Sequence, residues 1–256
     1  NPTEPEYSRQ GWVKMVELPY EYPNKKVFVI NEDDNWSHVI ANTYVEMAES
    51  DNWEVVGKET VPIGISEWGG ILTKIRATNP SMIFMITLSP ISEASFLRQF
   101  QTNPTNSLIF MPYTPIAPEF KELAGEFGNG VLWNQLVVNP PTPEGEAFKK
   151  AFIERWGEEY WRIDTPVQIW DAMHLWKNAV EAVGKVDSYR EIANYIESNP
   201  YEGLAGKYVY PKETHVAISG DEYVPAGFYQ VQDGMDVQLT PERYKQGEFM
   251  IPRWIK

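Results

Sequence analysis

The sequence predicts an α/β protein with a doubly wound parallel sheet, and two features of the chain support this prediction. Short runs of consecutive apolar residues, such as 27–30 and 82–88, are typical of strands that are buried on both faces. Between these runs lie segments whose apolar residues recur at helical spacing. Strands that alternate with helices form parallel sheets covered on both faces, so residues 25–136 are expected to fold in this way.

The strands and helices of this region follow one another in strict alternation. Strands are predicted at 27–30, 53–56 with 58–61, 82–88, 108–111 and 131–136. The first helix begins at Trp36 and has apolar residues at positions 36, 39, 40, 44, 47 and 48. Ser66 can cap the second helix, Ser89 and Pro90 begin the third, and 117–127 forms the fourth.

A proline-rich crossing at 140–143 separates this region from a different pattern. Three helices are predicted after it, at 143–156, 166–183 and 188–198, followed by strand-like pieces at 207–210 and 227–232. The residues that we expect these helices to bury are Phe148, Ala151, Phe152 and Trp156 in the first and Ile169, Met173, Trp176 and Val180 in the second.

Composition narrows the possible partners. The 256 residues carry a formal net charge of −14, which repels nucleic acid and anionic lipid, so we expect neither to bind. The absence of cysteine excludes thiolate catalysis, disulfides and cysteine metal sites. No apolar run reaches the ~18 residues of a membrane span. No signal-peptide pattern follows Asn1, so we expect that a leader was removed or never existed.

Motifs for catalysis are missing from the chain. There is no G-x-S-x-G elbow, no phosphate-binding loop and no dinucleotide fingerprint. His38, His174 and His215 are far apart in sequence and lack metal-ligand spacing. We therefore expect no catalytic residue, no metal site and no cofactor, and a protein that binds its ligand by contact alone. The acidic run 32–34 is either a cation or ammonium site or a solvated loop, and the solvated loop is favoured.

The predicted fold places the ligand site at the carboxyl ends of the strands. In this chain those ends lead into the loops 31–36, 89–90 and 112–117. Trp36 lies in the first loop, where a helix start normally carries a small polar residue. Its indole ring either faces a ligand or packs in the core, and both interpretations are open.

Several segments, in order along nearly the whole chain, resemble the type I periplasmic binding proteins of the leucine/isoleucine/valine class, which deliver solutes to ABC importers. The corner EDDNWS at 32–37 is similar to the family's strand–DDxYG–helix corner. Further similar segments are LTKIRATNPSMIFM at 72–85, TPEGEAFKKAFIERWG at 142–157, IWDAMHLWKNAVEAVG at 169–184 and GLAGKYVYPKETH at 203–215.

The resemblance implies two α/β lobes that are joined by hinge crossings and close on a solute. Residues 1–24 would be a leading segment and hinge, 25–137 with 226–256 the C-terminal lobe, and 138–225 part of the N-terminal lobe. Family members carry a complete half-lobe before the first crossing, whereas this chain starts almost at that crossing. The resemblance therefore implies a truncated or processed chain, or a second chain that completes the first lobe.

Carried over residue by residue, the resemblance implies six ligand contacts. These are Trp36, Ser37, Ser89, Tyr113, Thr114 and Thr165. Trp36 takes the place of a ligand-contacting Tyr, and Thr165 comes from the other lobe. Ser89 stands near the place of an aromatic residue, and no carboxylate is found at Thr114. A small organic solute, either an amino acid or a related compound, is therefore expected rather than a branched-chain amino acid in particular.

The resulting functional prediction is a solute-binding protein of an ABC importer. It would act in the periplasm or outside the cell, with a lipoprotein anchor as one option for the full-length form. It would bind its solute in an interlobe cleft and present it to the permease subunits in the membrane. The alternative that stays open is a ligand-sensing receptor ectodomain of the same fold, without transport.

Overall fold

The computed structural model describes residues 3–256, which form two compact units. The first, the sheet unit, comprises residues 4–134, 228–240 and 245–256. The second, the helical unit, comprises residues 135–227 and 241–244 together with Thr3. Each unit is described by itself. The predicted assignment of these residues to a C-terminal and an N-terminal lobe stays a prediction.

The sheet unit is built on seven strands in the order β2-β1-β3-β4-β5-β8-β9. The strands are β1 (Lys26–Glu32), β2 (Glu54–Val61), β3 (Met82–Ile86), β4 (Leu108–Phe110), β5 (Leu132–Gln135), β8 (Gly227–Gln232) and β9 (Met235–Thr240). β1 pairs in parallel with β2 and β3, β3 with β4, and β4 with β5, whereas β8 and β9 are antiparallel. The predicted doubly wound parallel sheet is confirmed, with an antiparallel pair added at one edge.

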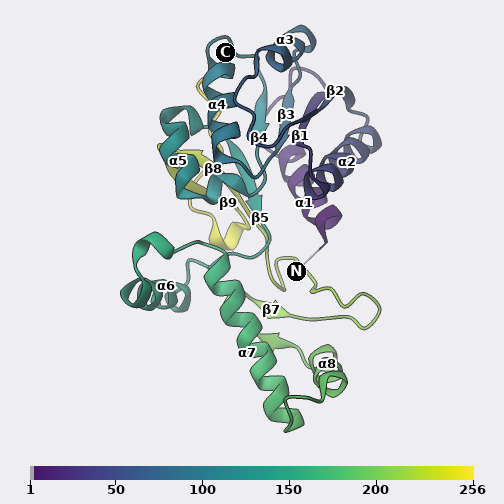
Figure 1. Ribbon diagram of the computed structural model, residues 1–256, viewed down its shortest axis with the longest axis vertical. Coiled ribbons are helices and arrows are strands. Elements are labelled where there is room, and N and C mark those ends of the chain that lie inside the picture. Colours follow the sequence, from purple (N-terminus) through teal and green to yellow (C-terminus); the bar gives the residue numbers. More distant parts are fainter. Residues whose placement is uncertain (1–2) are drawn as a thin grey trace. The chain divides into compact units, whose positions relative to one another are not determined.

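Helices cover both faces of this sheet. They are α1 (Glu4–Val16), α2 (Asn35–Ser50), α3 (Gly69–Thr78), α4 (Pro90–Gln101) and α5 (Pro118–Ala124), with 3-10 turns at Thr114–Ile116 and Gly125–Gly128. The chain winds from β1 outward to β2 and then back to β3, β4 and β5. Because such crossovers are right-handed, α2 lies on the opposite face from α3, α4 and α5, and α1 lies beside α2 (Figure 1).

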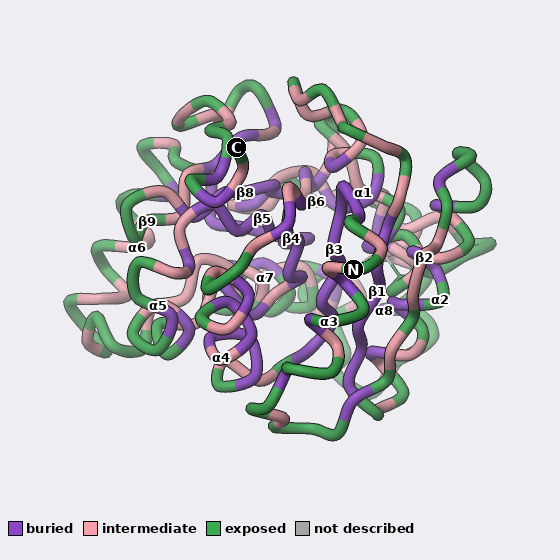
Figure 2. The backbone as a smooth tube through the Cα atoms, turned by 90° about the horizontal axis from the view of Figure 1, so that it is seen from above, coloured by how far each residue is buried: buried purple, intermediate pink, exposed green. Residues whose placement is uncertain are grey.

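The core of the sheet unit lies along β1, β3 and β4, which are buried throughout apart from the first residue of β1 (Figure 2). Their side chains pack against the large buried aromatic rings of the flanking helices. The largest of these buried rings on helices belong to Tyr7, Trp12, Tyr44, Phe96, Phe100 and Phe120. Continuous burial of this kind is expected for parallel strands that are covered on both faces.

The helix α1 was not among the predicted elements. Its buried residues, Tyr7, Ser8, Gly11, Trp12 and Met15, recur at helical spacing, but two of them are not hydrophobic and the apolar signal is therefore weak. Gly11 allows close packing, because a Cβ atom there would lie 2.9 Å from Oη of Tyr44 and 3.0 Å from Cζ of Phe110. α1 therefore sits closer to α2 and β4 than a larger residue would permit.

The helical unit contains α6 (Pro143–Trp156), α7 (Thr165–Val183), α8 (Tyr189–Ser198) and the short antiparallel pair β6 (Tyr201–Glu202) and β7 (Lys207–Tyr208), with 3-10 turns at Glu158–Tyr160 and Glu242–Tyr244. α7 is anchored to the following loop by Asp171, which is buried. Oδ1 of Asp171 accepts a hydrogen bond from N of Leu204 at 2.7 Å, and Oδ2 accepts from N of Ala205 at 2.9 Å and Oη of Tyr208 at 3.0 Å.

The predicted buried faces of α6 and α7 are wrong in several positions. Trp156 is 56% exposed, Ile169 59%, Met173 57% and Trp176 43%. Ala151 is exposed as well, and Phe148, Phe152 and Val180 are half-buried. The helices have the expected periodicity, but the described residues of this unit supply no layer that covers those side chains. Spacing alone predicted an apolar face without establishing what packs on it.

Candidate functional site

The candidate site lies in the sheet unit, at the carboxyl ends of β1, β3 and β4. The strand order reverses here, because β1 is followed by an outward crossover to β2 and β3 lies on the other side of β1. Reversal points of this kind leave a crevice outside the strand ends, where doubly wound proteins bind ligands. The loops that begin at these ends carry Trp36, Ser89 and Tyr113.

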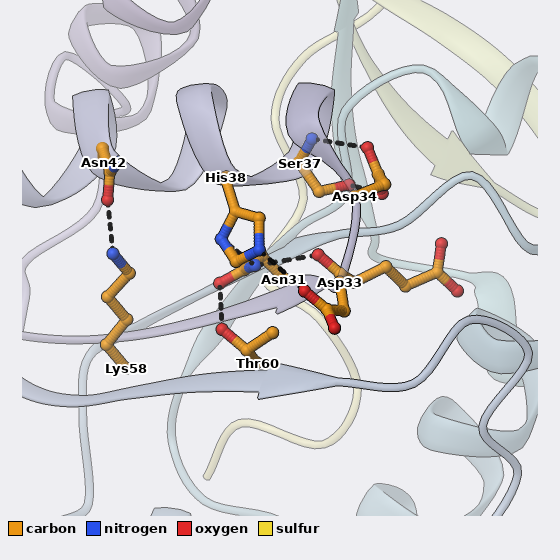
Figure 3. Close-up of polar contacts among 9 residues, drawn as sticks. Asn31, Asp33, Asp34, Ser37, His38, Asn42, Lys58 and Thr60 are labelled. Atoms are coloured by element: carbon orange, nitrogen blue, oxygen red, sulfur yellow. Dashed lines mark hydrogen bonds and ion pairs between the residues drawn. The ribbon is translucent and has the colours of Figure 1, made fainter.

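The loop after β1 is organised by a capped helix start. Oδ1 of Asp34 accepts a hydrogen bond from N of Ser37 at 2.9 Å, and Oγ of Ser37 donates to Oδ2 of Asp34 at 2.6 Å. Figure 3 shows both contacts at the first turn of α2. Asp34 is therefore the N-cap, which explains why the bulky Trp36 can occupy the first turn of the helix.

His38 holds the same loop on its other side (Figure 3). Nδ1 of His38 lies 3.2 Å from Nδ2 of Asn31, and Nε2 lies 3.0 Å from Oδ1 of Asp33. Since Nδ2 of Asn31 can only donate, Nδ1 accepts and Nε2 carries the proton toward Asp33. Both ring nitrogens of His38 thus bond to side chains of this loop.

Trp36 and Tyr113 come together from different strand ends. Their ring centroids lie 5.7 Å apart with an angle of 57° between the planes, and both side chains are half-buried. Tyr113 also stacks on the buried ring of Tyr7, with centroids 4.5 Å apart. Trp36 is therefore not enclosed between sheet and helix, but contributes to an aromatic cluster at the strand ends.

Tyr113 is held in a strained backbone conformation. Its φ and ψ are 67° and −57°, and N of Thr114 donates to O of Pro112 at 2.8 Å across it. This combination is a γ-turn, which is rare for a residue with a side chain. Strain of this kind is maintained only when surrounding contacts fix it, and it is concentrated at functional sites.

Beside Thr87 and Thr114 lies a buried carboxyl group, that of Glu93, which the sequence pattern did not indicate. Oε1 of Glu93 accepts from Oγ1 of Thr87 at 3.1 Å, and Oε2 has no hydrogen-bond partner. The hydroxyl of Thr114 lies close to Glu93 but donates to O of Thr87 at 2.7 Å. Burial raises the pKa of Glu93 well above its usual value, and the nearby Glu32 raises it further.

Glu32 is also buried, at 2% exposure. Oε1 accepts from N of Gly64 at 3.2 Å and from Oγ of Ser92 at 3.3 Å, and Oε2 accepts from N of Leu88 at 3.1 Å. The favoured interpretation of the acidic run as a solvated loop is thus wrong for Glu32. Asp33 is exposed and Asp34 caps α2, so the three residues have three different roles.

The remaining predicted contacts differ in their surroundings. Ser37 is fully buried, and Thr114 is 6% exposed. Ser89 is half-buried and caps α4, because its side chain accepts from N of Ser92 at 3.2 Å. Thr165 belongs to the helical unit, where it is exposed and donates to Oδ1 of Asp164 at 3.1 Å. The structure brings Trp36, Tyr113 and Thr114 to one edge, and the role of all six residues as ligand contacts stays a prediction.

Sequence reasoning missed Tyr7 and Glu93. Tyr7 lies on the helix that was not predicted, and its hydroxyl donates to O of Asn134 at 2.9 Å. Glu93 lies on a correctly predicted helix, four residues after its N-cap Ser89, where an acidic residue is usual for its effect on the helix dipole. Only the packing of α4 against the strand ends buries it.

Among residues 3–256, no group of three or more His, Asp or Glu side chains is placed to hold a metal ion. In the same part of the chain no helix has the length and apolar character needed to cross a bilayer.

Comparison with known proteins decides the family. A family profile described as "Periplasmic binding protein" matches residues 9–234. The chain belongs to the periplasmic binding protein family. Members of this family are extracytoplasmic solute-binding proteins. The resemblance found in the sequence and the predicted fold class are therefore confirmed.

Solved structures of periplasmic binding proteins share this fold. A protein of Silicibacter pomeroyi described as a candidate branched-chain amino acid ABC transporter has a TM-score of 0.88 and 27% identity, with 99% of this chain and 68% of that chain covered. The leucine-binding protein LivK of Thermotoga maritima has a TM-score of 0.75 and 18% identity, with coverages of 92% and 64%. A solute-binding protein of R. palustris in complex with benzoate has a TM-score of 0.73 and 17% identity, with coverages of 99% and 66%.

The present chain thus spans about two thirds of the length of these periplasmic binding proteins. A search of curated proteins gave no match.

Proposed function

We propose that this protein is the solute-binding component of an ABC importer and binds a small organic solute, an amino acid or a related compound, at the carboxyl edge of the sheet unit. The single observation that carries the proposal is the pair formed by Trp36 and Tyr113. Two half-buried rings from separate strand ends meet at the position where this fold binds ligands. Membership in the periplasmic binding protein family supports transport as the context.

The contacts around the rings favour binding without chemical change. Hydroxyl and carboxyl groups near them serve as helix caps or bond to backbone, as for Asp34, Ser37, Ser89 and Thr114. Such groups fix loop geometry, and none of them forms a pairing of nucleophile and base. We therefore propose that the solute leaves unchanged and that the bound form is presented to the permease, in the periplasm or outside the cell.

We further propose that polypeptide outside residues 3–256 covers the exposed face of α6 and α7. This face is formed by Trp156, Ile169, Trp170, Met173 and Trp176, each at least 43% exposed. Exposed apolar area costs about 25 cal/mol per Å², and a large patch is typical of an interaction surface. The solved relatives have longer chains, so further sequence of the same protein or a second chain is the proposed partner.

A solute screen tests the proposed function. The purified chain is heated with amino acids, amides, polyols and aromatic acids, and a bound solute raises its unfolding temperature because it stabilises the folded state by mass action. Isothermal titration then compares Trp36→Ala with Tyr189→Ala, a substitution of an exposed tyrosine in the helical unit. Loss of binding in Trp36→Ala alone is expected. Unchanged affinity in Trp36→Ala, or conversion of the solute into a product, would overturn the proposal.

A further inference from the structure

The rings of Trp36 and Tyr113 form an open angle that we call the aromatic corner. The ring planes make an angle of 57° and the centroids lie 5.7 Å apart, so the two rings are tilted toward each other and not stacked. Tyr7, which is 1% exposed, stacks behind Tyr113 and supports it. The γ-turn at Tyr113 fixes the direction of its ring. The corner is therefore rigid on the Tyr113 side.

The charges around the aromatic corner have one sign. The loops and first helical turns that follow β1, β2, β3 and β4 are residues 31–39, 62–68, 87–93 and 111–119, and they contain no Lys or Arg. Their acidic residues are Glu32, Asp33, Asp34, Glu67 and Glu119, together with Glu93, whose raised pKa favours the uncharged form. Their single histidine, His38, bonds to Asn31 and Asp33 of the first loop. The edge therefore attracts cations and repels carboxylates.

The helix starts at this edge do not offset that preference. Helix N-termini bind anions when their N–H groups are free. At the start of α2 the side chain of Asp34 accepts a hydrogen bond from the N–H group of Ser37, and at the start of α4 the side chain of Ser89 accepts one from the N–H group of Ser92. The negative charge of Asp34 also compensates the positive end of the helix dipole. An anionic solute would thus have to displace these caps.

The hydrogen-bonding groups near the corner limit which cation can bind. Both carboxylate oxygens of Asp34 bond to Ser37, and the hydroxyl of Thr114 bonds to Thr87. A primary ammonium group needs acceptors for its N–H groups, and here it would compete with these bonds. A fully alkylated ammonium group has no N–H group, and it binds through attraction to the faces of aromatic rings.

Glu93 is fully buried at this edge, beside Thr87 and Thr114. Burial raises its pKa well above the usual value and favours the uncharged carboxyl group, so the negative charge of the edge comes from the other acidic residues.

On the basis of the proposed function, we propose that the solute carries an alkylated ammonium group, and that this group binds in the aromatic corner of Trp36 and Tyr113. The acidic residues of the edge attract the cation, and the two rings contact it. The solute is then an organic cation rather than a carboxylate such as benzoate.

Isothermal titration with matched probes tests this inference. The probes are choline, its uncharged isostere 3,3-dimethylbutan-1-ol, leucine and benzoate, each titrated into the full chain. Choline should bind about tenfold more tightly than the isostere, which corresponds to the range of cation–π energies. Trp36→Leu and Tyr113→Leu should each abolish that preference, whereas Trp36→Phe should keep most of it because a ring remains. Tyr189→Leu should bind choline like the unchanged protein.

The outcomes separate this inference from the proposed function. Equal affinity for choline and its isostere, or choline binding that survives Trp36→Leu, overturns the inference. Binding of leucine or benzoate at Trp36 with no binding of choline overturns the inference and leaves the proposed function standing. Absence of binding by every solute of the wider screen overturns the proposed function itself. Far-ultraviolet circular dichroism confirms that each variant is folded, and Trp36→Phe provides the test if Trp36→Leu is not.

Discussion

Tyr7 stacks on Tyr113 with ring centroids 4.5 Å apart and an angle of 25° between the planes. The two residues lie more than a hundred positions apart in sequence, one on α1 and one after β4. The hydroxyl of Tyr7 donates to O of Asn134 and also lies beside the backbone N–H group of Tyr113. A single tyrosine on the first helix therefore supports the strained turn that positions the candidate site.

Removing the hydroxyl of Tyr7 should destabilise the sheet unit. Tyr7→Phe leaves the buried O of Asn134 without its donor, and we expect a loss of about 1–3 kcal/mol of unfolding free energy. The control is Tyr189→Phe, because Tyr189 is 75% exposed and the removal of its hydroxyl should cost little. Urea unfolding measures both. Equal losses in the two variants would contradict the assigned role of Tyr7.

The cap of α2 gives a second prediction. Asp34→Ala removes the acceptor of both hydrogen bonds from Ser37, and the expected loss is about 0.5–2 kcal/mol. Asp33→Ala removes only a 74% exposed partner of His38 and should change stability by less than about 0.5 kcal/mol. If urea unfolding shows Asp33→Ala to be the more damaging change, the cap assignment is wrong.

Glu93 should make stability depend on pH. Its pKa is raised in the folded state by burial, so the folded protein binds more protons than the unfolded chain at intermediate pH. The unfolding free energy should therefore fall as pH rises from the usual pKa of a glutamate through the raised value. Glu93→Gln removes this titration and should flatten the decline.

The matched control for this titration is Glu67→Gln, an exposed glutamate on the same edge, which should keep the decline of the unchanged protein. Urea unfolding at a series of values between about pH 4.5 and pH 8, where buried carboxyl groups titrate, measures how the unfolding free energy changes with pH. An unchanged slope in Glu93→Gln would show that another group causes the pH dependence.

In the helical unit, Asp171 should be required for the loop that follows β6. Asp171→Asn places an amide N–H₂ group against donors that now bond to a carboxylate oxygen, so we expect a loss of about 1–3 kcal/mol. Tyr208→Phe removes only one of the three donors and should cost less. Hydrogen exchange of the amides of Leu204 and Ala205 reports the loop directly. Unchanged protection in Asp171→Asn would refute the assignment.

Substitutions on the exposed face of α7 should leave stability almost unchanged. Ile169→Glu and Met173→Glu should each change the unfolding free energy by less than about 0.5 kcal/mol, because both side chains are already exposed. They should also reduce binding of a hydrophobic dye and self-association measured by light scattering. Val167→Ala, which truncates a fully buried residue of the same helix, should instead destabilise by about 0.5–3 kcal/mol. A loss above this range for Ile169→Glu would mean that the face is covered in solution.

Much of the fold could be predicted from local sequence pattern. The apolar run at 27–30 lies in β1, the first five residues of the run at 82–88 form β3, and the alternation with helices gave the correct sheet class. Trp36 was correctly located at a strand end. These features follow from the periodicity of apolar side chains within single elements, and this periodicity is visible in the sequence.

The candidate site required the tertiary structure. The sequence shows Tyr7, Glu93 and Tyr113 as residues of separate segments, and nothing in their local pattern indicates that one stacks on another or that the carboxyl group is buried. The exposed face of α7 shows the same limit, since an amphipathic helix predicts an apolar surface without identifying its partner. By itself the sequence determined which segments become strands and helices. Burial, strain at Tyr113 and the missing partner of Glu93 were decided by the structure, because they depend on contacts between distant segments.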